Sequence, residues 1–170
     1  MYQGEVIMSG SGPAILSQSM PESHVAASEE IETRFGRVVV YRQQPISFPN
    51  GLLGIPDKMQ YCLTRFPSEK MARFKLLQSL EDTQLSFITL PVDITNPLIE
   101  QADIEQAASD LDIAVGGLAV LLVVTVHRES GLAKLSVNAR APILINVNRR
   151  VAVQYVFPHT KYLIRQPLTA

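Results

Sequence analysis

The longest apolar run of the chain, Leu118–Val126 (LAVLLVVTV), constrains the fold more than any other feature. It contains no charged residue, glycine or proline, and β-branched residues dominate its second half. This composition favours a strand, and the absence of alternation predicts that both faces of the strand are covered. Even when extended back to Ile113, the uncharged stretch is shorter than the ~18–20 apolar residues that cross a bilayer. The run therefore predicts a central buried strand rather than a membrane helix.

Further segments with strand character surround this run and are separated by turns of hairpin length. They are residues 31–41 with a turn or bulge at Gly36, 46–48, 60–66, 74–80, 85–90 ending at Pro91, 132–139, 143–147, 151–156 and a last edge strand at 162–164. Polar turns are predicted at 127–131 and 148–150. The sequence thus predicts a mainly β fold, an antiparallel and partly closed β-barrel-like domain.

One stretch, residues 97–112, departs from the strand pattern. Its apolar residues follow helical spacing, at Ile99, Ala102, Ile104, Ala107, Ala108 and Leu111. Asn96 and Asp103 are candidate caps, because their side chains can accept hydrogen bonds from the first free amides of a helix. The stretch predicts one short helical insert, as a single helix or as two pieces.

Composition places the chain among globular proteins with one main domain. Of its 170 residues, 46% are hydrophobic and the net charge is −1, so no global basic field attracts nucleic acid. Residues 1–28 are rich in Ser, Gly, Ala and Pro and predict a flexible tail, with the domain spanning residues 29–170. The lone Cys62 lies in an apolar run and predicts a packed thiol. No basic-then-apolar segment opens the chain, so a cytoplasmic protein is expected.

The sequence offers no arrangement of residues for catalysis. The three histidines, His24, His127 and His159, lack metal-ligand spacing with one another or with Cys62. Gly51 and Gly54 are not followed by the helix and lysine of a phosphate-binding loop. We therefore expect neither an enzyme nor a bound cofactor or metal.

Candidate partner-binding residues come from two polar interruptions of apolar segments. Phe48 and Asn50 lie in the predicted turn Phe48–Leu52 (FPNGL), which is either a fixed corner or an exposed recognition loop. Gln78 and Ser79 are polar within an apolar strand, and belong either to its outward face or to a partner contact.

Two more candidate pairs complete the set. Asn138 and Asn146 flank Pro142, which removes a backbone donor, so they either satisfy the interrupted strand or face a partner. Asp103 and Glu105 belong to an acidic stretch that is either a solvated face or a means of attracting a basic partner.

Four segments in fixed order carry a resemblance to a known family. They are TRFG at 33–36, ISFPNGLLG at 46–54, LQSL at 77–80 and NARAPILIN at 138–146, with Gln154, Tyr162 and Arg165 as further matching positions. Together they resemble the flagellar assembly factor FliW, over about residues 31–168.

The resemblance implies a non-catalytic protein that binds CsrA, a translational regulator, and antagonises its repression of flagellin mRNA. It also implies binding of flagellin in competition with CsrA, as a chaperone-like factor. The antagonism would be non-competitive with RNA, which is a coupling free energy between two sites on CsrA. No direct nucleic-acid or membrane contact is implied.

Two other functions are open from the residues alone. A small-ligand-binding β-barrel would need an enclosed apolar pocket. An RNA-binding module of the OB type would need salt-sensitive RNA binding, which the charge balance does not favour.

Overall fold

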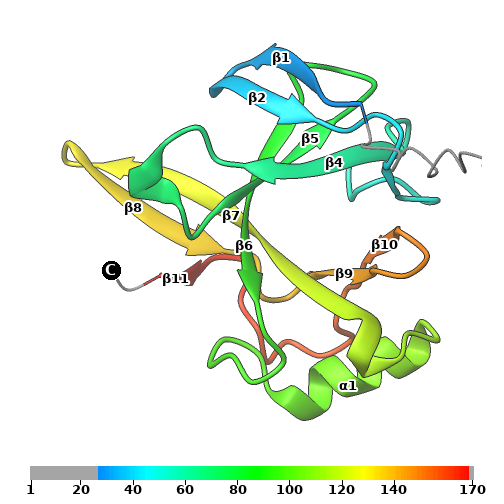
Figure 1. Ribbon diagram of the computed structural model, residues 1–170. Coiled ribbons are helices and arrows are strands. Elements are labelled where there is room, and N and C mark those ends of the chain that lie inside the picture. Colours follow the sequence, from blue (N-terminus) through cyan, green and yellow to red (C-terminus); the bar gives the residue numbers. More distant parts are fainter. Residues whose placement is uncertain (1–26, 169–170) are drawn as a thin grey trace, which may run out of the picture.

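The computed structural model describes residues 27–168 and shows a mainly β domain with one α-helix in that range (Figure 1). The predicted tail, residues 1–28, lies outside the described residues except for Ala27 and Ser28. The strands are β1 (Glu29–Thr33), β2 (Gly36–Val40), β3 (Ile46–Ser47), β4 (Gln60–Arg65), β5 (Lys75–Ser79), β6 (Ser86–Val92), β7 (Leu118–Glu129), β8 (Leu132–Val137), β9 (Ile143–Asn146), β10 (Val151–Gln154) and β11 (Gln166–Pro167). The helices are α1 (Gln101–Asp110) and the single 3₁₀ turns η1 (Glu69–Met71) and η2 (Val115–Gly117).

The larger sheet closes on itself through the pairing of β7 with β9. Its strand order is β11-β8-β7-β6-β5-β4-β3-β10-β9, and the additional β7–β9 pairing joins the β9 end back to β7. This closes a ring from β7 to β9 and leaves β8 and β11 outside it. The pairings are antiparallel except for one parallel contact between β10 and β3. The prediction of a mainly β, antiparallel, partly closed domain with one short helical insert is confirmed.

Adjacent residues of the ring strands point into two different apolar cores. The inner core comes only from ring strands and the turn after β3, and includes Phe48, Tyr61 and Leu121. The outer core lies between the ring and its covering elements, the β1–β2 hairpin and α1, and includes Leu122. Leu121 and Leu122 are 1% and 0% exposed. Two cores explain why the strand sequence shows no alternation.

The ring interior is filled by large side chains. Phe48 and Tyr61 are both fully buried there, with ring centroids 5.0 Å apart in an edge-to-face arrangement. Burial raises the pKa of the Tyr61 hydroxyl to about 12. In the described part of the chain, the space that a small ligand would need inside the ring is occupied by these residues.

The central strand is longer than its apolar run. We predicted a polar turn at 127–131, but β7 continues to Glu129 and only Ser130 and Gly131 form the turn. Both have positive φ, 52° and 82°, the pattern of a tight type I′ hairpin. The polar residues fit a strand here because this end of β7 pairs with β8 outside the ring, where side chains meet solvent.

Proline does not end β6 as predicted. Pro91 lies within the strand, opposite Leu121 of β7. The amide of Ser79 donates to the carbonyl of Leu85, so odd-numbered residues of β6 direct their backbone groups toward β5. The β5 ladder stops at Thr89, and the missing amide of Pro91 therefore faces an edge without a partner strand.

Three smaller predictions were wrong. The last edge strand is β11 rather than residues 162–164, since Tyr162 is buried in the outer core. Strand β10 ends at Gln154. Helix α1 has Glu100 at its N-cap with no side-chain cap bond, and Asp103 lies within the first turn instead. Asn96 accepts from the amides of Leu98 and Ile99, but these residues form a turn that precedes the helix.

Candidate partner-binding site

The turn after β3 is a backbone corner that requires glycine. Gly51 has φ of +61°, and a Cβ atom there would lie 2.5 Å from the carbonyl oxygen of Ile55. The Gly51 amide donates to the carbonyl of Phe48, and the amide of Phe48 donates to Met59. Phe48 itself is fully buried, so it anchors the corner, whereas Asn50 is exposed on it.

One glutamine links this corner to the segment around Pro142. The Leu53 amide donates to Oε1 of Gln154 at 3.0 Å, and Nε2 of Gln154 donates to the carbonyl of Ala141 at 3.3 Å. Leu53 is 59% exposed beside a surface depression of about 350 Å³ between the corner and β10. Two segments about ninety residues apart in the sequence thus meet at one exposed apolar surface.

Gln78 and Ser79 hold the turn between β5 and β6 from inside. Both are fully buried. The Gln78 amide nitrogen lies within 3.2 Å of four backbone carbonyl oxygens of that turn, and its Oε1 accepts from the hydroxyl of Ser86. The Ser79 hydroxyl accepts from the amides of Glu81 and Asp82. Their side chains support the loop and are not part of the free surface.

Asn138 and Asn146 each close a local turn at an end of the Pro142 segment. Oδ1 of Asn138 accepts from the Ala141 amide, and Oδ1 of Asn146 accepts from the Arg149 amide, both at 3.0 Å. Both side chains are half-buried. These bonds satisfy backbone donors where the ladder is interrupted.

The acidic face of α1 is joined to the C-terminal segment by a cluster around Asp103. Its carboxylate accepts from the Tyr162 hydroxyl and, at 3.0 Å, from Nζ of Lys161. These two bonds hold the pKa of Asp103 below its usual value. Lys161 also pairs with Glu100 at 2.6 Å, and both acids raise the pKa of Lys161. Part of the acidic charge is therefore compensated within the protein.

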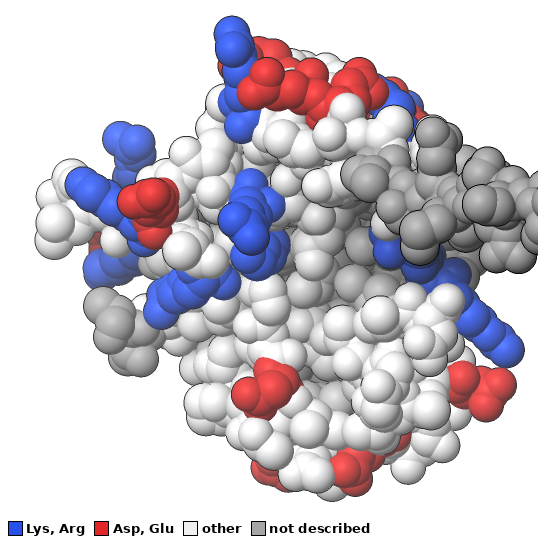
Figure 2. Space-filling model, viewed as in Figure 1, with Lys and Arg blue, Asp and Glu red and all other residues white. Residues whose placement is uncertain are grey.

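The remainder of the helix keeps its negative charge toward solvent. Glu105 is exposed, and its carboxylate accepts from the neutral amide of Gln101 at 2.7 Å. Asp110 accepts from Gln106 and from the Tyr155 hydroxyl, which lower its pKa. Figure 2 shows acidic groups at the bottom of the molecule, where α1 lies in Figure 1.

The eight candidate residues do not form one continuous surface. Phe48 and Asn50 lie at the corner beside β10, Gln78 and Ser79 at the β5–β6 turn, and Asp103 and Glu105 on α1; Asn138 and Asn146 close the two turns beside β9. The sequence also gave no reason to single out Leu53 or Lys161, whose roles depend on contacts with distant segments.

Two further observations bear on chemistry and location. Within residues 27–168, no three His, Cys, Asp or Glu side chains come together as a metal ion would require. No helix in that same range combines the length and apolar character of a membrane span.

The domain is a closed ring of strands with one core inside the ring and a second core outside it, and Gln154 links the corner after β3 to the Pro142 segment. These features place it in the class of closed, mainly β domains. The chain belongs to the FliW family, since the family model described as FliW protein matches residues 29–168.

Individual relatives agree with this assignment. The chain is 33% identical over 137 residues to a flagellar assembly factor FliW of Natranaerobius thermophilus, covering 79% of this chain and 87% of that protein. It is 29% identical over 147 residues to the FliW of Leptospira interrogans, covering 82% and 92%. A crystal structure of the flagellar assembly factor FliW shares the fold, with a TM-score of 0.63, 21% identity and coverage of 84% of this chain and 98% of that one.

Proposed function

We propose that this protein is a flagellar assembly factor that works by binding and not by catalysis. The observation that carries the proposal is membership of the FliW family over residues 29–168, which includes every segment that meets at the corner. The relatives named above are flagellar assembly factors. Four of the candidate residues, Gln78, Ser79, Asn138 and Asn146, hold turns of the domain through hydrogen bonds to its backbone, which suits a protein that presents a fixed surface to partners.

The first proposed partner is a CsrA-like translational regulator. Such a partner binds RNA and is therefore expected to be basic. The solvated carboxylates of α1, Glu105 and Asp110, offer the opposite charge, and such complementarity raises the association rate. Binding of this protein would antagonise CsrA at a distance from its RNA surface and so relieve repression of flagellin mRNA.

The second proposed partner is flagellin, bound in competition with the regulator. Free flagellin would then displace CsrA from this protein, and the released CsrA would repress further flagellin synthesis. The alternative of an OB-type RNA-binding module predicts RNA binding by this protein alone. That binding would weaken steeply with salt.

Calorimetric titration tests the proposal with the CsrA homologue and the flagellin of the same organism. We expect CsrA to bind and flagellin to displace it. Binding of flagellin alone would reduce the proposal to a flagellin-binding factor. Binding of neither folded partner would contradict it.

Matched variants locate the CsrA contact. We expect Glu105→Lys to slow CsrA association by about tenfold at low salt, because it reverses a charge facing a basic partner. Glu69→Lys, which changes the same charge in η1 outside the α1 face, serves as the control. Equal rates for the two variants, measured by stopped-flow fluorescence, would place the regulator elsewhere.

A further inference from the structure

A second surface lies near the β1–β2 hairpin, at the other end of the molecule from α1 in Figure 1, and has features that no proposed role uses. Strands β6 and β7 pair only from Thr89–Val92 and Val120–Val123, and beyond this point they separate. The opening is a cleft of about 470 Å³, lined by Arg34, Phe35 and Ile88 and by Val124–Val126 of β7. It lies beneath the tight turn of the β1–β2 hairpin.

The β7 side of this cleft is an unpaired strand edge. The Asn138 amide donates to the carbonyl of Val123, so odd-numbered residues of β7 direct their backbone groups toward β8. Even-numbered residues, from Val124 to Arg128, therefore direct theirs into the cleft, where the β6 ladder has ended. Such an edge is a template for an added strand.

The β6 side is also open at its edge, and a cation already occupies part of it. The backbone groups of Ser86 and Ile88 face the cleft, since odd residues of β6 pair with β5. The Arg34 guanidinium donates to the Ser86 carbonyl at 2.6 Å and lies 4.7 Å from the centroid of the Phe35 ring.

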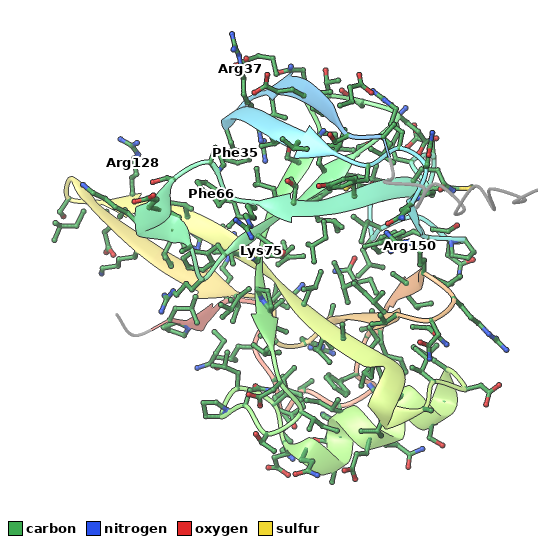
Figure 3. All side chains as sticks on the ribbon, viewed as in Figure 1. Phe35, Arg37, Phe66, Lys75, Arg128 and Arg150 are labelled. Carbon is green, nitrogen blue, oxygen red and sulfur yellow. The ribbon has the colours of Figure 1, made fainter. Side chains whose placement is uncertain are left out.

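The lining of the cleft is apolar. Phe35 packs against Phe66, with ring centroids 5.6 Å apart, and Val126 is 45% exposed although its neighbour Val124 is buried. Figure 3 shows Phe35, Phe66 and Lys75 close together on the viewed face, with Arg128 on the β7–β8 arm. Alternate apolar side chains of an added strand would find a contact surface here.

Cationic side chains surround the cleft: Arg34 lines it, Arg65 and Lys75 line a separate depression together with Glu69, and Arg128 comes two residues after Val126 on the same edge of β7. These four cations are called the rim. Arg65 and Lys75 stand directly opposite one another in the β4–β5 ladder, an arrangement that disfavours folding. Among the described residues, no carboxylate lies within 4.0 Å of the charged nitrogens of Arg34, Arg65, Lys75 or Arg128. In Figure 2, Lys and Arg cross the middle of this face, with one acidic group among them at the left and other acidic groups above and below.

We propose that this cleft binds an extended, acidic segment of flagellin, which adds as a strand to the Val124–Arg128 edge of β7. The proposal rests on the proposed function for its choice between two partners. A basic RNA-binding regulator would be repelled by this rim, so flagellin is the partner that the charge admits. Strand β7 begins after α1 and η2 and runs past the cleft to Glu129, so one element connects the two proposed binding faces. The competition between flagellin and CsrA would then act between these two faces, as a coupling free energy, rather than at one shared surface.

Two substitutions at one position separate the backbone contribution from the side chain. Val126→Pro removes an amide that faces the cleft and no donor of the β7–β8 ladder, whereas Val126→Ala keeps that amide. By calorimetry we expect Val126→Pro to weaken flagellin binding about tenfold beyond Val126→Ala, as for a lost hydrogen bond. CsrA affinity and the urea midpoint of Val126→Pro show whether the domain stays intact.

A charge reversal with a matched control tests the rim. We expect Arg128→Glu to weaken flagellin binding by about tenfold or more, and Arg149→Glu, in the turn after β9, to leave it unchanged. Wild-type affinity in both Val126→Pro and Arg128→Glu would overturn the cleft proposal while leaving the proposed function intact. Failure of the unmodified protein to bind flagellin would overturn both. Binding of single-stranded RNA that Arg128→Glu abolishes would assign the cleft to RNA and overturn the flagellin segment.

Discussion

The two halves of strand β7 have opposite surroundings although one apolar run, Leu118–Val126, extends across the point where they divide. Residues 118–123 pair with β9 or β6, and with both at 120 and 121, and Val120–Leu122 are at most 3% exposed. Residues 125–129 pair only with β8, and Val126 is 45% exposed. A run of apolar β-branched residues therefore does not reveal whether a strand edge is occupied. Whether this edge is occupied depends on where the neighbouring strand, β6, stops pairing with β7.

The largest expected difference between the halves is in stability. We expect Leu122→Ala to lower the free energy of unfolding by about 2–5 kcal/mol, because it leaves a cavity in the outer core. Val126→Ala should change it by less than about 0.5 kcal/mol, since that side chain is already half in water. Urea unfolding of both variants checks this. Equal losses would mean that the exposed half is packed in solution.

The corner after β3 packs against the inner core of the ring, on the buried side of the comparison. A single added methyl group there should lower the stability of the domain strongly. We expect Gly51→Ala to cost about 1–3 kcal/mol, because the residue has positive φ and its Cβ would meet the backbone at Ile55 and Pro56. Gly54→Ala is the control, having positive φ but open space around the added atom. Thermal unfolding should rank Gly51→Ala as the less stable; the reverse order would show that the corner relaxes.

A substitution of Gln78 tests whether this buried polar side chain stabilises the β5–β6 turn. We expect Gln78→Leu to cost about 1–3 kcal/mol, because the carbonyl groups of the β5–β6 turn lose their donor. The same variant should raise amide exchange between Glu81 and Leu85. Unchanged exchange there would show that the turn holds without the glutamine.

The smallest effect is expected at Asp103 of α1, in the pH dependence of the stability of the domain. The pKa of Asp103 is lowered by Tyr162 and Lys161, so the carboxylate stabilises the fold above its unfolded pKa of about 3.9. That contribution is lost as the pH falls through the lowered folded value. Asp103→Asn should therefore be less stable than the parent by under about 1 kcal/mol near pH 6. The gap should narrow below about pH 4; a gap that is constant with pH would exclude this ionisation as its source.

Much of the fold was predictable because its signals are local. The hairpin at Gly36, the β5–β6 hairpin and the helix at 101–110 each follow from turn chemistry or spacing within a few residues. Pro91 was misread because its tolerance depends on the end of the β5 ladder, which is a tertiary fact.

The candidate sites were less predictable because their roles depend on tertiary contacts. Polarity drew attention to Gln78 and Asn138, but it cannot separate an amide that holds a buried loop from one that meets a partner. The opposed Arg65 and Lys75 lie ten positions apart, and only the β4–β5 register shows that they face each other.

Amide hydrogen exchange along β7, read by NMR with and without flagellin, tests the central claim most directly. In the free protein, the amides of Thr125 and His127, which face β8, should exchange slowly, and those of Val124, Val126 and Arg128 should exchange fast. Flagellin should protect the second set and leave the first unchanged, the alternation of a strand added to an open edge. Uniform protection in the free protein, or flagellin binding without protection of Val126 and Arg128, would contradict the account.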